Sequence, residues 1–197
     1  MITVIAIIAV LAGLVLGIYK VVKHQSAKAQ ADTDIHELGA ALQSYRTDNG
    51  GYPQDIQKTD KLDARNVSDA TDGSPTGKMA ASSKYLYECL TGDTNDNGAM
   101  TRNYAPGFFT PSRLGGPRVG NSVNPIQYIR DPFGNSYGYS TAGLLLEQEY
   151  RASLATNPNA PRPVQNSQGA QGYNPTFDLW STAGDTTGNT AKWAKNW

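Results

Sequence analysis

MITVIAIIAVLAGLVLGIY, residues 1–19, contains no charged residue, and Thr3 is its only conventionally polar side chain before Tyr19. As an α-helix this stretch would be about 28 Å long, close to the ~30 Å hydrocarbon core of a bilayer. Three interpretations fit: a helix for a membrane or a polymer core, a signal peptide, or a buried core helix. No basic segment precedes the run and no clear cleavage site closes it. Because the polar remainder offers little apolar surface, we favour the membrane or polymer helix.

The helix is predicted to continue beyond the apolar run. No proline occurs before Pro53, and residues 48–51 (DNGG) form a strong stop signal. Between these points the apolar residues recur at steps of three and four, namely Ile35, Leu38, Leu42 and Tyr45. We therefore predict one helix of roughly 48 residues, about 70 Å long, whose second half needs a partner along its amphipathic face. The domain organisation follows: residues 1–50 as the helix (1–19 apolar, 20–50 amphipathic) and residues 51–197 as a globular domain.

The globular part is predicted to be α+β, with a small antiparallel sheet and long loops. Residues 51–82 are rich in Asp, Ser, Thr, Gly and Lys and predict an extended loop. A short helix is expected over residues 82–90, capped by Ser82 or Ser83. Strands are expected at residues 136–140 and, as the last one, 176–181. Residues 143–155 fit a helix or the start of a strand, and residues 157–175 a loop.

Composition and residue counts exclude several functions. Seventeen basic and 17 acidic residues give zero formal net charge, which excludes a polycationic nucleic-acid binder. Cys89 is the only cysteine, so no internal disulfide forms, and we expect it to be a small buried residue. His24 and His36 both lie on the long helix and are interpreted as solvated. Without histidine in the globular part or a phosphate loop, we predict no catalytic residue and no enzyme activity.

One segment suggests calcium. Asp93, Asn95 and Asn97, followed by Gly98, fit the opening of an EF-hand loop, in which alternate oxygen ligands converge on one ion. The twelfth position is Tyr104 rather than the bidentate glutamate. A solvated Asn/Asp/Gly turn is therefore favoured over a calcium site.

Four motifs in order resemble the type IV pilin superfamily and, within it, the major pseudopilin of type II secretion. VIAIIAVLAGLVLG (residues 4–17) is similar to the apolar start of mature pilins, and ALQSYRTDNGGYP (41–53) to the end of their helix. DPFGNSYGY (131–139) and FDLWSTAGD (177–185), with the terminal Asn196-Trp197, resemble pseudopilin segments. The resemblance implies a pilin-like α+β fold in which the long helix packs on the small sheet. The interval between Tyr139 and Phe177 is long for this family and is interpreted as an insertion that forms subunit-specific surface.

The resemblance implies a structural subunit that polymerises through its apolar helix. The implied partners are further copies of the protein in a helical homopolymer, minor pseudopilins and the secretion or pilus assembly machinery. Gly13 and Gly17 form a G-x-x-x-G spacing that allows close helix approach, or are simply tolerated glycines. The residues expected to carry assembly are Val4, Ile7, Ile8, Val10, Leu11, Gly13, Leu14 and Gly17.

The expected location is the bacterial inner membrane as a single-pass protein, then a periplasmic or extracellular filament; methylation is also implied. Lys20, Lys23 and Lys28 would place the domain in the cytoplasm by the positive-inside rule. The family has the opposite topology, which we follow. Family members carry a basic leader, a Gly–Phe junction and a glutamate just before the position of Met1. We expect Met1 to be either an internal methionine or the first residue of a shortened chain.

Pseudopilins of this type have a calcium site in the C-terminal loop. Asp185 falls near the matching position, and Asp178 matches the aspartate of the final strand motif. The family's later acidic pair has no counterpart in residues 188–197, which offer Asn189, Lys192 and Lys195. No cofactor is required, and Ca²⁺ is the one candidate. The alternative, which we favour, is that apolar burial of Trp180, Trp193 and Trp197 holds this loop. Two other functions stay open: a surface pilin for adhesion or motility, and a membrane-anchored ligand-binding module.

Overall fold

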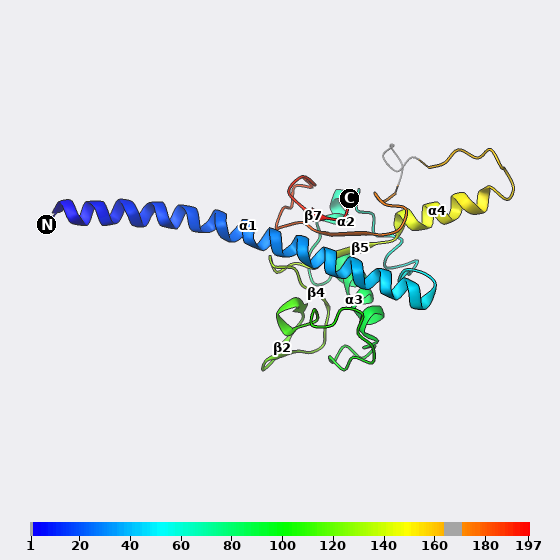
Figure 1. The fold of residues 1–197 in the computed structure, drawn as a ribbon, viewed down its shortest axis with the longest axis horizontal. Helices are drawn as coiled ribbons and strands as arrows, with labels where there is room; N and C mark the ends of the chain where they lie inside the picture. Colours follow the sequence, from blue (N-terminus) through cyan, green and yellow to red (C-terminus); the bar gives the residue numbers. More distant parts are fainter. Residues whose placement is uncertain (1, 164–170) are drawn as a thin grey trace.

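A single long helix extends along most of the molecule. The computed structural model describes residues 2–163 and 171–197, with side chains described from Tyr19 onward. Helix α1 spans Ile2–Asn49, which confirms the predicted continuous helix. It ends where Gly50 adopts a left-handed backbone (φ 78°) and donates its N–H to the Arg46 carbonyl oxygen at 2.8 Å. The first part of α1 projects from the molecule, and the rest of the protein packs against its second part (Figure 1).

The second half of α1 docks through the predicted apolar face. Ala31, Leu38 and Leu42 are fully buried, and Ile35 and Ala41 almost so. These positions recur every three or four residues and therefore line one side of the helix. Ala31 is the first buried residue of α1 among the described side chains. Burial of α1 by the domain thus begins at Ala31, in the second half of the helix.

The domain consists of short elements joined by long loops. The described residues form three antiparallel sheets, of two, two and three strands: β1 with β4, β2 with β3, and β5–β6–β7. The elements after α1 are α2 (Val67–Ala70), α3 (Lys78–Thr91), the 3₁₀ helix η1 (Pro111–Arg113), β1 (Leu114–Gly115), β2 (Arg118–Val119), β3 (Ser122–Val123), β4 (Tyr128–Ile129), β5 (Gly138–Ser140), α4 (Ala142–Ser153), β6 (Asp178–Ser181) and β7 (Ala194–Lys195).

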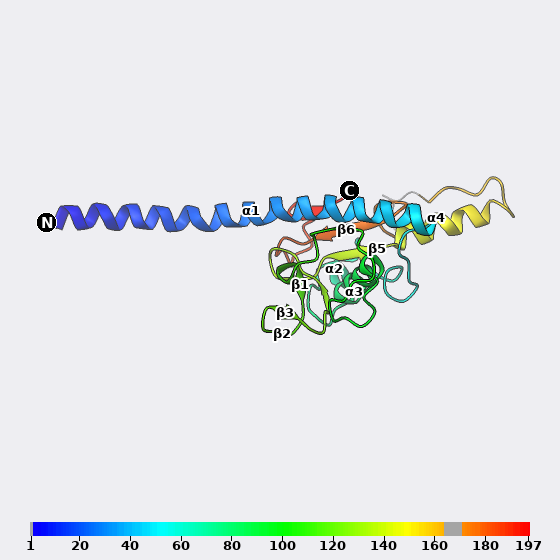
Figure 2. The same cartoon turned by 60° about the horizontal axis from the view of Figure 1, so that its bottom comes forward.

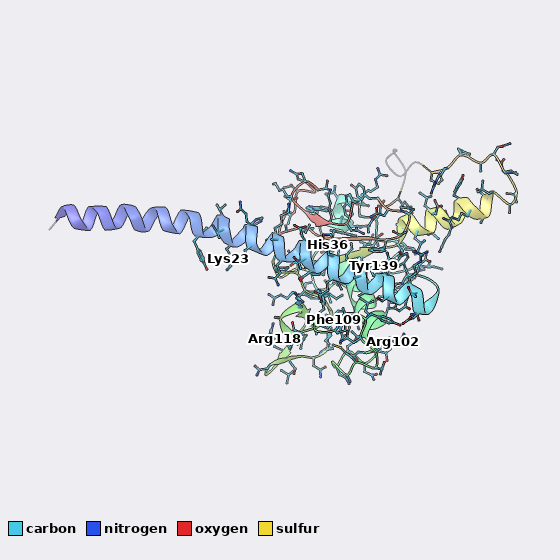
Figure 3. All side chains as sticks on the ribbon, in the orientation of Figure 1. Lys23, His36, Arg102, Phe109, Arg118 and Tyr139 are labelled. Carbon is cyan, nitrogen blue, oxygen red and sulfur yellow. The ribbon has the colours of Figure 1, made fainter. Side chains whose placement is uncertain are left out.

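The three-stranded sheet lies between two helices. Strands β6 and β7 contact α1, and β5 contacts α3 (Figure 2). Tyr139 of β5 pairs with Leu179 of β6, and Trp180 with Lys195 of β7. Tyr139, which Figure 3 labels beside α1, is fully buried and donates its hydroxyl to the Pro53 carbonyl oxygen at 2.7 Å. The architecture confirms the predicted α+β, pilin-like fold.

The start of α3 was predicted wrongly. The helix begins at Lys78, after Gly77, so Ser82 and Ser83 are not caps but buried residues inside it. Their hydroxyls bond strand backbone instead: Ser82 donates to the Tyr139 carbonyl oxygen, and Ser83 accepts the N–H of Ile129 at 2.9 Å. Small hydroxyl side chains let α3 approach the strands closely. The extended loop predicted for residues 51–82 is therefore corrected, because α2 and the first turn of α3 lie within this range.

One open choice is resolved, and two strand predictions need correction. Residues 142–153 form a helix, which resolves the choice left open for this segment. The strand expected at residues 136–140 is shorter, with Ser136 in an isolated bridge to Arg130. Strand β6 is not the last, because β7 follows it beside Trp180.

A second core of Leu62, Ala64, Ala70, Met79, Trp180 and Trp193 covers the sheet away from the main core.

Candidate functional site: the exit of the long helix from the domain

A turn at residues 131–135 meets α1 where it leaves the domain. The buried Asp131 carboxylate accepts the N–H groups of Phe133 at 3.0 Å and Asn135 at 2.8 Å, and the Ser181 hydroxyl at 2.5 Å. Burial raises the pKa of Asp131, although these hydrogen bonds favour its charged form. The turn is thereby fixed to β6 and presents Phe133 to α1. The ring of Phe133 lies 5.1 Å from that of His24.

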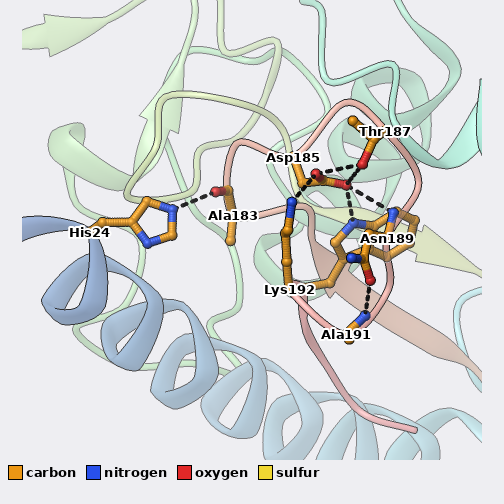
Figure 4. Close-up of polar contacts among 8 residues, drawn as sticks. His24, Ala183, Asp185, Thr187, Asn189, Ala191 and Lys192 are labelled. Carbon is orange, nitrogen blue, oxygen red and sulfur yellow. Dashed lines mark hydrogen bonds and ion pairs between the residues drawn. The ribbon is translucent and has the colours of Figure 1, made fainter. Parts of the chain in front are cut away.

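His24 makes a second contact at the same place. Its Nε2 lies 3.2 Å from the carbonyl oxygen of Ala183 (Figure 4), so Nε2 is the donor and carries the hydrogen. His24 and His36 are both exposed, which confirms the prediction that they are solvated. The prediction missed that His24 ties α1 to the turn after β6.

Exposed apolar side chains surround this exit. Tyr19, Val21 and Val22 are 63%, 56% and 55% exposed. Two open hollows of about 450 and 340 Å³ lie along α1 beside Pro132, one lined by Tyr19 and Val22 and the other by His24 and Phe133. Lys23 borders both hollows, and Figure 3 shows it on the part of α1 just outside the domain. Grouped exposed apolar residues of this kind are typical of an interaction surface.

A buried polar group holds α1 against the domain, and sequence reasoning missed it. Asp34 is fully buried, accepts Arg113 Nη2 at 2.7 Å and accepts the Tyr137 hydroxyl at 2.9 Å. Burial raises the pKa of Asp34, opposed by the Tyr137 hydrogen bond and the Arg113 charge. The guanidinium of Arg113 also lies 4.5 Å from the centre of the Phe108 ring. The available signal was an acidic residue inside an apolar stripe, next to Ile35.

The predicted calcium residues of the 93–98 segment form a closed turn. The carboxylate of Asp93 is buried and accepts the Gly98 N–H at 2.7 Å, the Tyr87 hydroxyl at 2.8 Å and the Asn95 N–H at 3.2 Å. Asn97 uses its side-chain oxygen for the N–H of Ala99. Because N–H and O–H donors already surround the Asp93 carboxylate, this arrangement does not fit a calcium cage.

Asp178 and Asp185 lie in separate environments. Asp178 of β6 is buried and accepts the N–H groups of Tyr173 at 2.7 Å and Asn174 at 2.9 Å. Burial raises its pKa to about 6, against these hydrogen bonds. Within the described part of the protein, no group of three or more His, Cys, Asp or Glu side chains is arranged to hold a metal ion. The two predicted calcium positions, the 93–98 segment and the C-terminal loop with Asp178 and Asp185, thus contain no such group among the described residues, and calcium stays an untested prediction.

Asp185 organises the C-terminal loop through hydrogen-bond donors (Figure 4). It accepts the Thr187 hydroxyl at 2.8 Å, the Asn189 N–H at 2.9 Å and Lys192 Nζ at 3.4 Å. Burial acts to raise its pKa, but these bonds and one from Trp193 Nε1 lower the pKa to about 2. The buried Trp180 and Trp193, with the partly buried Trp197, agree with the prediction that tryptophans hold this loop.

The remaining predicted residues are placed as follows. Cys89 is half-buried rather than buried, and burial raises the pKa of its thiol despite hydrogen bonds with Tyr85 and Tyr45, which disfavours a reactive thiolate. The assembly residues between Val4 and Gly17 lie on the α1 backbone, and their side chains lie outside the described residues. Among the residues whose side chains the structure describes, from Tyr19 onward, no helix is both long enough and apolar enough to cross a bilayer.

The fold and this exit define a pilin-like protein: one long helix, half docked on a small antiparallel domain and half projecting. Residues 20–86, about a third of the sequence, match the model of the family described as "Type II secretion system (T2SS), protein G". The match runs from the exit of α1 into α3 and confirms the predicted resemblance to the major pseudopilin. Comparisons with curated proteins and with solved structures gave no significant match.

Proposed function

We propose that this protein is a structural subunit of a pilus-like filament, the pseudopilus of a type II secretion system, and that it polymerises through residues 1–19. The observation that carries the proposal is the division of α1. Its second half is docked from Ala31 onward, and its first part projects away from the domain (Figure 2). The family match over residues 20–86 supports the same function.

The division of α1 has an energetic consequence. Each large apolar side chain transferred from water to an apolar environment contributes about 1.5–3 kcal/mol. The eight predicted assembly residues and their neighbours lie on the projecting part, where the protein's own domain does not reach. These side chains are buried in lipid before assembly and between the helices of neighbouring copies afterwards. Extraction from the membrane is feasible because the second environment replaces the first.

The docked half of α1 holds the projecting apolar segment in a fixed orientation relative to the domain. Three contacts fix the direction in which α1 leaves the domain. They are the Asp34–Arg113 ion pair, the His24–Ala183 hydrogen bond and the packing of Phe133 on His24. A fixed direction gives every copy the same geometry toward its neighbour. Repeated heterologous contacts that do not close on themselves generate an open filament rather than a ring. Tyr19, Val21 and Val22 at the exit are the described residues best placed to contact a neighbouring helix.

The resemblance supplies the cellular setting of the proposal. The subunit waits as a single-pass inner-membrane protein with its domain on the exported side and then enters a periplasmic filament. Its partners are further copies of the same protein, minor pseudopilins and the assembly machinery. A surface pilin shares the fold and the helix, and the family match favours the pseudopilin over it.

Two substitutions in the apolar segment test the proposal. Val10→Asp and Leu14→Arg are expected to abolish filaments, seen by sedimentation and electron microscopy, because a charge in a packed helix bundle has no partner. The near-ultraviolet circular dichroism of the domain is expected to stay unchanged. Ile56→Asp is the matched control, since Ile56 is an exposed apolar residue of the domain. Normal filaments from both apolar-segment variants would contradict the proposal.

A further inference from the structure

A pocket lies at the end of α1 that is opposite to the exit. It occupies about 260 Å³ between the last turns of α1, the loop that follows them and helix α4. Arg46 comes from α1, Leu144, Gln148 and Arg151 from α4, and Thr176 from the loop before β6. One wall is therefore built by the segment between Tyr139 and Phe177, which was predicted to be a subunit-specific insertion.

Arg46 is a guanidinium without an acidic partner. It stacks over the ring of Tyr52, 5.1 Å from the ring centre, and Nη1 donates to the Tyr52 hydroxyl at 3.3 Å. Among the described side chains no carboxylate oxygen lies within ion-pair distance of it. The aromatic face holds the guanidinium in place, while most of its donors remain available.

Arg151 adds a second, incompletely neutralised positive charge. Its Nε donates to Glu147 at 2.9 Å, but the same carboxylate also pairs with Arg162 Nη2 at 3.2 Å. Hydrogen bonds from Arg151 and Arg162 lower the pKa of Glu147, so this group carries its charge at neutral pH. One carboxylate thus faces two guanidiniums, and no acidic side chain lines the pocket itself.

The remaining residues that line the pocket are uncharged. Gln54 and Gln148 hold each other through a reciprocal amide pair, at 3.3 and 3.1 Å, which fixes α4 against the loop after α1. Leu144 and Pro175 supply apolar surface, and Thr176 a hydroxyl. A volume of 260 Å³ is below the usual range for a drug-sized ligand and suits one side chain or one peptide end.

We propose that this pocket binds a carboxylate presented by a segment of a partner protein, through Arg46 and Arg151. A guanidinium matches a carboxylate with two parallel N–H···O bonds, and the apolar wall suits the aliphatic part of the same residue. The carboxylate is either that of an Asp or Glu residue or that of a free carboxyl terminus. This inference does not depend on the filament function, because the pocket is lined by Arg46 near the C-terminal end of α1 and by residues of α4. The projecting segment is the opposite end of α1 (Figure 1).

The test uses the full-length protein in detergent and three fluorescent short peptides of one neutral sequence. One carries an internal glutamate and an amidated end, one a free C-terminal carboxylate, and one neither. By fluorescence anisotropy we expect saturable binding of one or both carboxylate peptides, with Kd on the order of 0.1–1 mM, and none of the neutral peptide. The peptide that binds identifies the source of the carboxylate.

Variants assign the binding to the pocket. Arg46→Gln and Arg151→Gln are each expected to weaken it by about tenfold or more, the loss of one charged hydrogen-bond partner. Arg151 is a safe second variant because its side chain is mostly exposed. Arg118→Gln, on exposed strand β2, is the matched control and should bind like the unchanged protein. Equal binding of all three peptides, full affinity in both pocket variants, or tighter binding of inorganic phosphate than of either peptide would overturn the proposal.

Discussion

Arg113 of η1 donates a 2.7 Å hydrogen bond to Asp34 of α1, joining residues 79 positions apart in the sequence. The Asp34 side chain is 1% exposed and that of Arg113 is 23% exposed. This pair is an ionic link between the docked half of α1 and the loops beneath it, and the Tyr137 hydroxyl adds a hydrogen bond to Asp34. Arg113 Nη1 also lies 3.7 Å from Glu37 of α1. The Asp34–Arg113 pair fixes the position of the helix more specifically than apolar packing alone.

Removing the arginine should loosen that attachment. Arg113→Met leaves the buried Asp34 carboxylate with Tyr137 as its remaining partner, so we expect the free energy of unfolding to fall by about 3 kcal/mol. Urea unfolding followed by tryptophan fluorescence measures this change. The double variant Asp34→Asn/Arg113→Met should lose less than the sum of the single variants. An unchanged urea midpoint for Arg113→Met would show that the pair does not stabilise the docked helix.

Gly138 tests the packing of the three-stranded sheet. A Cβ at this position would overlap the indole ring of Trp180, which is fully buried and donates Nε1–H to the Ala70 carbonyl oxygen at 2.9 Å. Gly138→Ala is expected to destabilise the domain by about 1–3 kcal/mol. Gly39→Ala is the matched control, because a Cβ there meets nothing within 4 Å. That control should stabilise α1 by about 0.5–1 kcal/mol, and equal thermal shifts of one sign would contradict the packing described.

Asp178 should make stability fall as pH rises. Its pKa is raised by burial from 3.8 to about 6, so the folded state holds the proton more tightly than the unfolded state. The resulting contribution is fully present below pH 3.8 and is lost as the pH passes through 6. The stability of the unchanged protein relative to Asp178→Asn should therefore drop by about 2 kcal/mol between pH 4 and 6. Urea titrations at several pH values measure it, and parallel curves would be the contrary result.

The C-terminal loop should depend on Asp185 far more than on Lys192. Asp185→Asn removes the charge that four donors converge on, so amide exchange across residues 187–193 should accelerate. Lys192→Met should change little, because its exposed ammonium pairs at 3.4 Å. The pKa of Asp185 is lowered to about 2, so its contribution is present above pH 3.8 and is lost as the pH falls through 2. Equal amide exchange rates in the two variants would contradict the greater importance of Asp185.

The same loop gives a test for calcium. Because donors rather than further acidic oxygens surround Asp185, we expect neither EDTA nor millimolar calcium to move the unfolding temperature of the full-length protein. Asp93→Asn should likewise leave the response to calcium unchanged. A stabilisation by calcium that Asp185→Asn removes would instead establish the site that the family resemblance implies.

Sequence predicted those features that depend on local pattern. The period of Ile35, Leu38 and Leu42 indicated the buried face of α1, and the glycines at 50 and 51 indicated its end. The strand predicted after the DPFGN segment also forms, although it is shorter than expected. In each case the deciding residues are neighbours in the sequence, so propensity and spacing carry the information.

Features that depend on distant partners were missed. Ser82 and Ser83 suggested a cap because hydroxyls commonly cap helices, yet here strand backbone 57 and 46 residues away uses them. Strand β7 is two residues long and exists because β6 offers it an edge. The pocket of Arg46 and Arg151 joins segments about a hundred positions apart. No local pattern distinguishes such residues from solvated ones.

The most direct measurement of the central claim is a site-specific photo-cross-link within assembled filaments. With a photoreactive residue in place of Leu11, we predict a ladder of covalent multimers, with the cross-link mapped by mass spectrometry to residues 1–19 of another copy. The same residue at Ile56, exposed on the domain, should not cross-link to that segment. Filaments in which position 11 cross-links only to lipid or to its own domain would contradict polymerisation through the apolar helix.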